Sequence, residues 1–189
     1  LAGACRVVGP GTVTGGADGI RSDGGARVEA GAVVTGNAGD GLRTDKTAKV
    51  TEATVQGNGG DGVRSKGAAV LKGATVDGNG GTGGRTDGTA NMQASTVQGN
   101  GEDGIHSEKV AKATKASQVK TNGFDGVRGL KVQLKDSEAT GNGTHPACGV
   151  TDDCADLASE FRPKVQGTST CGTSRDTELG GAWGVCAGD

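Results

Sequence analysis

The sequence has very few aromatic side chains: two Phe, one Trp and no Tyr in 189 residues. Without them, a wide aromatic core of the kind found in many globular enzymes cannot form. No apolar run approaches the roughly 20 residues that span a bilayer, so we expect no membrane span. The formal net charge is only −2, which argues against nucleic acid as a main partner, because nucleic-acid-binding domains carry clustered positive charge.

Glycine, in contrast, is abundant, with 39 residues, many of which follow a repeat. In most copies Asp-Gly is followed by an apolar and then a basic residue, and copies start 21 or 22 residues apart. The copies start at Asp18, Asp40, Asp61, Thr82, Asp103 and Asp125. An asparagine recurs in the same register, at Asn37, Asn58, Asn79, Asn100, Asn122 and Asn142. A fixed period of this length is typical of solenoid proteins.

Each repeat contains three short segments of alternating apolar and polar residues between Gly-rich corners, which predicts three strands with one face inward. The inward residues form three columns, which contain Val13, Ile20 and Val28 in the first copies. One coil cannot bury its inner face alone, so successive coils must stack. The predicted fold class is therefore all-β: a parallel β-helix (solenoid) of about six to seven coils of 21–22 residues.

This repeat pattern, over about residues 5–143, resembles the right-handed parallel β-helix repeat proteins of the pectate-lyase-like superfamily. The resemblance implies a right-handed solenoid and, as the usual activity, cleavage of polysaccharides by a lyase or hydrolase. However, no repeat carries a long insertion that would build a cleft, and aromatic residues that stack on sugars are nearly absent. We therefore predict that the protein is not an enzyme, with a polysaccharide lyase as the runner-up.

The recurring asparagines and aspartates are expected to stack in columns. Stacked Asn amides can hydrogen-bond to the coils above and below, which predicts a structural ladder. The carboxylates of Asp18, Asp40 and Asp61 can lie one coil apart and share a hard cation, which makes calcium a candidate ligand. In the alternative that we favour, each Asp bonds to backbone amides of its corner or faces a neighbouring Arg, and no cofactor is expected.

A basic column accompanies the aspartates and consists of Arg21, Arg43, Arg64, Arg85, His106 and Arg128. Acidic residues two positions along the chain, such as Asp23 and Asp45, can offset its charge, which favours a mixed solvated face. The alternative is a row that binds an acidic polysaccharide, since a guanidinium can hold a carboxylate through two hydrogen bonds.

The repeat stops near Gly143, which divides the chain into a parallel β-helix (1–143) and a C-terminal cap or docking segment (144–189). An apolar stripe in this segment predicts a short helix over 152–161, which Thr151 would cap and Pro163 would end. The stripe consists of Cys154, Leu157, Ala158 and Phe161. The stretches 156–159, 170–174 and 183–186 resemble the C-terminal segment of secreted bacterial β-helix repeat proteins.

Four of the five cysteines lie in the C-terminal segment, at Cys148, Cys154, Cys171 and Cys186. Four cysteines allow three disulfide pairings, of which we favour Cys148–Cys154 and Cys171–Cys186. A zinc site that uses His145 with three of these cysteines is the alternative. Disulfides would stabilise a segment with little core and indicate an oxidising compartment. Cys5 is left over, which suggests an intermolecular bond or a free thiol.

The sequence starts partway round a coil, because Arg6–Val8 align with Arg27–Glu29 one period later. An uncovered strand edge at this position would attract another chain. We therefore expect a non-catalytic structural protein, extracellular or at the cell surface, whose copies stack head-to-tail into a filament or surface fibre. The alternatives are a polysaccharide-binding or polysaccharide-cleaving protein and a fragment of a larger surface adhesin.

Overall fold

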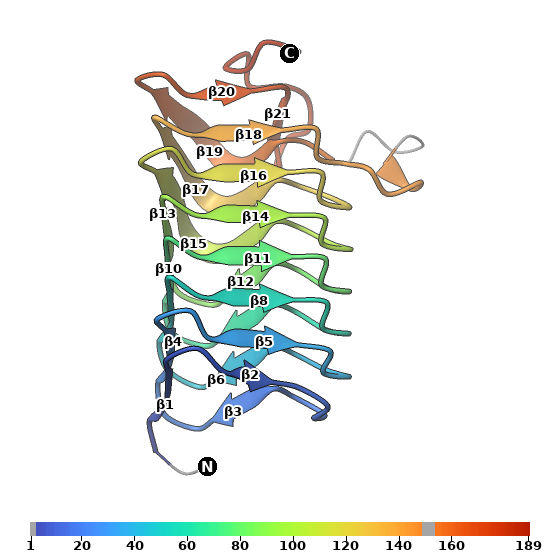
Figure 1. Ribbon diagram of the computed structural model, residues 1–189. Coiled ribbons are helices and arrows are strands. Elements are labelled where there is room, and N and C mark those ends of the chain that lie inside the picture. Colours follow the sequence, from blue (N-terminus) through green and yellow to red (C-terminus); the bar gives the residue numbers. More distant parts are fainter. Residues whose placement is uncertain (1–2, 149–153) are drawn as a thin grey trace.

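The computed structural model describes residues 3–148 and 154–189 as a stack of parallel β-coils (Figure 1). Two sheets run along the stack. The smaller sheet contains eight strands. They are β2 (Thr12–Val13), β5 (Val33–Thr35), β8 (Thr54–Gln56), β11 (Thr75–Asp77), β14 (Thr96–Gln98), β16 (Gln118–Lys120), β18 (Glu138–Thr140) and β20 (Thr170–Cys171).

The larger, 13-stranded sheet has two arms that merge farther along the stack. One arm holds β1 (Cys5–Val8), β4 (Ala26–Glu29), β7 (Ala48–Thr51), β10 (Ala69–Lys72) and β13 (Ala90–Gln93). The other holds β3 (Ile20–Ser22), β6 (Leu42–Thr44), β9 (Val63–Ser65), β12 (Gly84–Thr86) and, at the far end, β21 (Ser174–Asp176). The long strands β15 (Ile105–Thr114), β17 (Val127–Lys135) and β19 (Leu157–Gln166) run through both arms.

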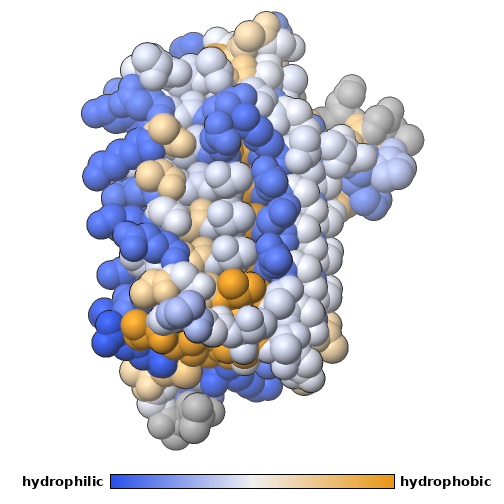
Figure 2. Space-filling view, in the orientation of Figure 1, coloured by the Kyte–Doolittle hydropathy of each residue, from blue (hydrophilic) through white to orange (hydrophobic). Residues whose placement is uncertain are grey.

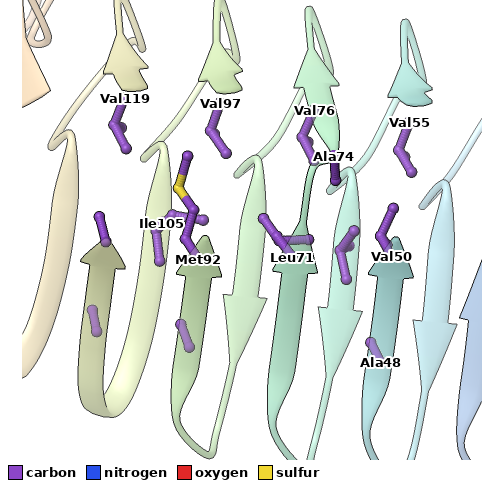
Figure 3. Packing of buried hydrophobic residues seen from close by; sticks show 14 of the residues in the cluster. Ala48, Val50, Val55, Leu71, Ala74, Val76, Met92, Val97, Ile105 and Val119 are labelled. Carbon is purple, nitrogen blue, oxygen red and sulfur yellow. The ribbon is translucent and has the colours of Figure 1, made fainter. Parts of the chain in front are cut away.

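The three predicted columns of inward side chains form the core. Val13, Val34 and Val55 pair in register in the smaller sheet, and the same register continues to Ala139. Ile20 and Val28 begin equivalent columns in the two arms of the larger sheet. Most members are 0–3% exposed, and Figure 3 shows them pointing into the space between the sheets. Many small buried side chains therefore take the place of an aromatic core. Their burial stabilises the fold by about 25 cal/mol for each Å² of apolar surface removed from water.

The solenoid extends beyond the predicted end of the repeat. The smaller sheet has one strand for each of eight coils, against the six to seven predicted. The additional strands β19, β20 and β21 pair in parallel with the preceding coil.

The predicted helix over 152–161 is wrong for its second half. Residues 157–161 belong to β19, where Leu157–Ser159 pair with Val127–Gly129. The open edge of β17 offers backbone hydrogen-bond partners to an added strand. This pairing outweighs the helical preference indicated by the spacing of a short apolar stripe. Thr151 and the first two residues of the predicted helix lie outside the described residues.

Candidate functional site

The six recurring asparagines form a continuous hydrogen-bonded ladder along the inside of one corner. The Nδ2 group of Asn37 donates to Oδ1 of Asn58 at 2.8 Å, and Asn58 donates to Asn79 at 2.9 Å. The same contact links each later pair, up to Asn142. From Asn58 onward, each Oδ1 also accepts the backbone N–H of the Asn one coil earlier, so each step satisfies two donors. The ladder predicted from the sequence is present, and it is structural.

Asp156 ends this ladder. Its Oδ1 accepts both the backbone N–H and the Nδ2–H of Asn142, and its Oδ2 accepts the N–H groups of Gly172 and Thr173. An ionised carboxylate only accepts hydrogen bonds, so it suits a position where every neighbour donates. Asp156 stands where earlier coils have a glycine such as Gly62, whose Cβ would lie 2.8 Å from Nδ2 of Asn79. We did not predict this role from the sequence.

The aspartates form a second column beside the ladder. Oδ1 of Asp18 accepts the backbone N–H of Asp40, and Oδ1 of Asp40 accepts that of Asp61. Asp61, Asp103 and Asp125 each hold the next coil in the same way, through the N–H groups of Thr82, Asp125 and Ala155. These carboxylates therefore bind backbone amides, as in the favoured alternative, but the amides belong to the next coil and not to the corner of the Asp itself.

The arginine column lies outward of the aspartates and contacts them weakly. The guanidinium groups of Arg43 and Arg64 lie 3.8 and 3.9 Å from Oδ2 of Asp40 and Asp61, beyond hydrogen-bonding distance. Oδ2 of Asp40 and of Asp61 has no hydrogen-bond partner within the described residues. Half-exposed guanidinium groups therefore lie over buried carboxylates without hydrogen-bonding to them, and the column is a mixed, partly neutralised face.

Two departures from the repeat compensate one another in this column. Thr82 replaces the aspartate of its coil, and the next coil places Glu102 where earlier coils have glycine. The Glu102 carboxylate accepts hydrogen bonds from Arg85 at 2.7 Å and from the Thr82 hydroxyl at 3.1 Å. A carboxylate from a different position therefore restores the missing negative charge.

His106 replaces an arginine in the same column. Its Nδ1 lies 3.0 Å from Oδ2 of the buried Asp103, and its Nε2 lies 3.3 Å from Glu108. Arg85 and Arg128 flank it in strand register. The imidazole of His106 thus lies between two carboxylates, at a position where the neighbouring coils have an arginine side chain.

Burial changes the proton affinity of two carboxylates in the aspartate column. Burial raises the pKa of Asp61 above its usual range, although the Thr82 N–H and Arg85 oppose this change. Burial and the nearby Asp103 carboxylate raise the pKa of Asp125 to about 6, and Arg175 opposes them. The Arg175 guanidinium lies 3.0 Å from Oδ2 of Asp125. Asp125 thus joins the regular coils to β21.

The aspartate column offers few ligands to a cation. Within the described residues, no three His, Cys, Asp or Glu side chains gather as metal ligands would. Calcium takes about six to eight oxygen ligands, whereas Asp40 and Asp61 each leave one oxygen without a partner. The calcium candidates Asp18, Asp40 and Asp61 therefore lie stacked as predicted, but in scaffold contacts.

The favoured disulfide pairing is confirmed. Cys148 is bonded to Cys154 and Cys171 to Cys186, so these cysteines do not form the alternative zinc site with His145. The two disulfides indicate an oxidising environment. Cys5 is a free, partly buried thiol, and its strand register places it in line with the inward residue Ala26.

Comparisons with known protein families, with curated proteins and with solved structures found no match to this chain. Among the residues that the structure describes, no helix is long and apolar enough to cross a membrane.

Proposed function

We propose that this protein is a non-catalytic extracellular structural protein whose copies stack head-to-tail into a filament or surface fibre. The observation that carries the proposal is the rim formed by β1, β2 and β3, where two of the three inner columns of the solenoid are only partly buried.

At this rim the core is partly exposed. Val7 and Val13, the first members of two inner columns, are only partly buried, whereas Ile20, which begins the third, is buried. Val8, on the outward face of β1, is 53% exposed. Figure 2 shows hydrophobic atoms gathered at the N-terminal end of the stack. Among the described strands, β1, β2 and β3 pair on one side only. Unpaired backbone groups beside apolar side chains are the features that a further β-coil would bind.

A structural role is also supported by the hydrogen bonds that the polar side chains of the repeat form with neighbouring coils. The asparagine ladder and the aspartate column hold backbone amides of neighbouring coils. Active sites usually depart from the regularity of their scaffold, and the departure at Thr82 is compensated by Glu102 within the same face.

The extracellular part of the proposal is supported by the two disulfides, which persist in oxidising compartments. The resemblance to the pectate-lyase-like superfamily, and to secreted bacterial members with a cysteine-containing C-terminal segment, belongs to the same proposal. It is supported by the stacked parallel coils.

An acidic polysaccharide is the second candidate partner, because Arg43 and Arg64 keep 43% and 48% of their side-chain surface exposed. It would bind along the arginine column, and the protein would then be a polysaccharide-binding or lyase-like β-helix. Incubation with acidic polysaccharides, followed by ultraviolet absorbance of unsaturated products, separates cleavage from a structural role, for which no absorbance is expected.

Sedimentation velocity over a range of protein concentrations tests the proposal. We expect the mass of the wild-type chain to grow with concentration without reaching a fixed value, as open head-to-tail contacts require. The substitution Val7→Lys should abolish growth, because it places a charge in the inner apolar column that the next copy would cover. Gln56→Lys, on an exposed position of a central coil, is the matched control and should leave growth unchanged. A monomer at every concentration would contradict the proposal.

A further inference from the structure

At the C-terminal end of the solenoid, the second half of β19 has an open strand edge among the described strands. β21 pairs only with Leu157–Ser159, so the second half of β19 has a paired strand on one side only among the described strands. Beside this half lies a groove of about 470 Å³, lined by Arg162–Gln166 together with Gly184 and Val185. Exposed edges of this kind accept added strands.

The chain's own C-terminal tail covers the neighbouring corner. The N–H groups of Ala187 and Gly188 donate to the carbonyls of Cys171 and Gly172, as the next coil would. The Asp189 carboxylate accepts hydrogen bonds from Ser174, Val185 and Cys186. Although burial raises the pKa of Asp189, the hydrogen bonds from Ser174 and from these N–H groups lower it overall. These contacts lie away from Lys164–Gln166, where Lys164 and Gln166 are exposed and Val165 is partly buried.

The open edge continues the inner column that starts at the N-terminal rim. Register pairs connect Val7 through six intermediate residues to Val165. The intermediate residues Val28, Val50, Leu71, Met92, Ala113 and Leu134 are 0–2% exposed. Val7 and Val165, at the two ends, are only partly buried. The column is thus buried between these two residues and partly exposed at each of them.

We propose that β1 of a second copy pairs with the open edge of β19. The register follows that of the solenoid: Arg6 beside Lys164, Val7 beside Val165, and Val8 beside Gln166. The added strand runs parallel, because every strand pair of both sheets is parallel. Val7 of the second copy then covers Val165 and extends the apolar column. This inference rests on the proposed head-to-tail association and specifies its junction.

The charges at this junction are partly balanced. Arg6 would lie beside Lys164, but its guanidinium already pairs with Glu29 at 2.8 Å. The solenoid tolerates the same stacking elsewhere, since Arg6, Arg27 and Lys49 pair in register. Salt should therefore strengthen the junction slightly by screening the remaining repulsion.

Disulfide trapping tests the register. Neighbouring parallel strands lie about 4.8 Å apart, within the Cα separation that a disulfide bridges. In a Cys5→Ser background, the double variant Val8→Cys with Gln166→Cys should form a ladder of covalent multimers after mild oxidation. The control pairs Val8→Cys with Lys164→Cys, two residues out of register and beyond bridging distance. It should remain uncrosslinked. Sedimentation of the reduced variants reports association independently.

The outcomes separate the junction from the proposed function. Multimers from the register pair and none from the control support the junction. If the chain associates but both pairs or neither pair crosslink, the junction is wrong and head-to-tail stacking stands. Crosslinking by Val8→Cys alone would indicate contact between two N-terminal rims and would also overturn the junction. Absence of association in every variant would overturn both proposals.

Discussion

The regular coils and the C-terminal region hold chain segments together in different ways. In residues 26–142 the same contacts recur from coil to coil, through the asparagine ladder and the aspartate column. In residues 154–189 single contacts replace them: Asp156 ends the ladder, a disulfide fixes Cys171, and Asp189 binds three residues of the tail. In a recurring column each side chain contacts the coils on both sides, so the loss of one member affects its neighbours. A single contact stabilises only its own surroundings.

A break in the middle of the ladder should have the largest effect. Asn79→Ala removes the acceptor for the backbone N–H and Nδ2–H of Asn58, and it removes a donor to Asn100. Because these groups are buried, we expect a loss of about 4 kcal/mol of unfolding free energy. Urea denaturation measures it. Gln56→Ala, at an exposed position, is the control and should cost under about 0.5 kcal/mol. Equal costs would contradict a stabilising role of the asparagine ladder.

Loss of the tail disulfide should have a smaller and local effect. The bond between Cys171 and Cys186 closes a separation of 15 residues, which corresponds to about 3 kcal/mol, against roughly 2 kcal/mol for the separation of 6 in Cys148–Cys154. We expect Cys171→Ser with Cys186→Ser to increase amide hydrogen exchange in 170–189 and to leave exchange in 26–142 unchanged. Increased exchange throughout the coils would show that loss of this disulfide also destabilises the regular coils, which would contradict a local effect.

Asp125 connects the two regions and should make stability depend on pH. Its folded pKa of about 6 exceeds the usual value of 3.8, so the folded chain binds the proton more tightly than the unfolded chain. The contribution of Asp125 is therefore complete below pH 3.8 and is lost as the pH rises through 6. Between pH 4 and 6.5 the loss is about 2 kcal/mol.

Comparison with Asp125→Asn isolates this effect. The amide keeps an oxygen for the Ala155 N–H but carries no charge. Between pH 4 and 6.5, we expect the unfolding free energy of the wild type to fall by about 2 kcal/mol relative to that of Asp125→Asn. A difference that is independent of pH would contradict the assignment to Asp125.

Removal of calcium should have the smallest effect. Because Asp18, Asp40 and Asp61 use their Oδ1 atoms on backbone amides, we expect the Tm to be the same in calcium and in a chelator. A rise in Tm with calcium that is lost in Asp40→Asn would instead establish a calcium site in the aspartate column.

The regular coils could be predicted from the sequence because each inference was repeated in several copies. The columns that contain Val55, Leu71 and Ile105 keep one register over six or seven turns. The ladder followed from the same periodicity. One irregular coil offers no such repetition, and a stripe of apolar residues near Leu157 had helical spacing. The sequence Leu157-Ala158-Ser159 does match Ile105-His106-Ser107, an apolar residue followed two positions later by an inward serine, and this signal could have identified β19.

The role of Asp156 and the compensation by Glu102 could not be predicted in this way. Each depends on a side chain that crosses from its own column into the neighbouring one. Periodicity assigns a residue to a column, but it does not say where the side chain reaches when its neighbour changes.

Negative-stain electron microscopy of the chain at high protein concentration tests the central claim most directly, because it images the contacts between copies. Eight coils at about 4.8 Å each give a subunit length of roughly 38 Å along the stack. We predict unbranched fibres of uniform width with this axial repeat, which disappear in Val7→Lys. Dispersed single particles of the wild-type chain, or fibres that persist unchanged in Val7→Lys, would contradict the account.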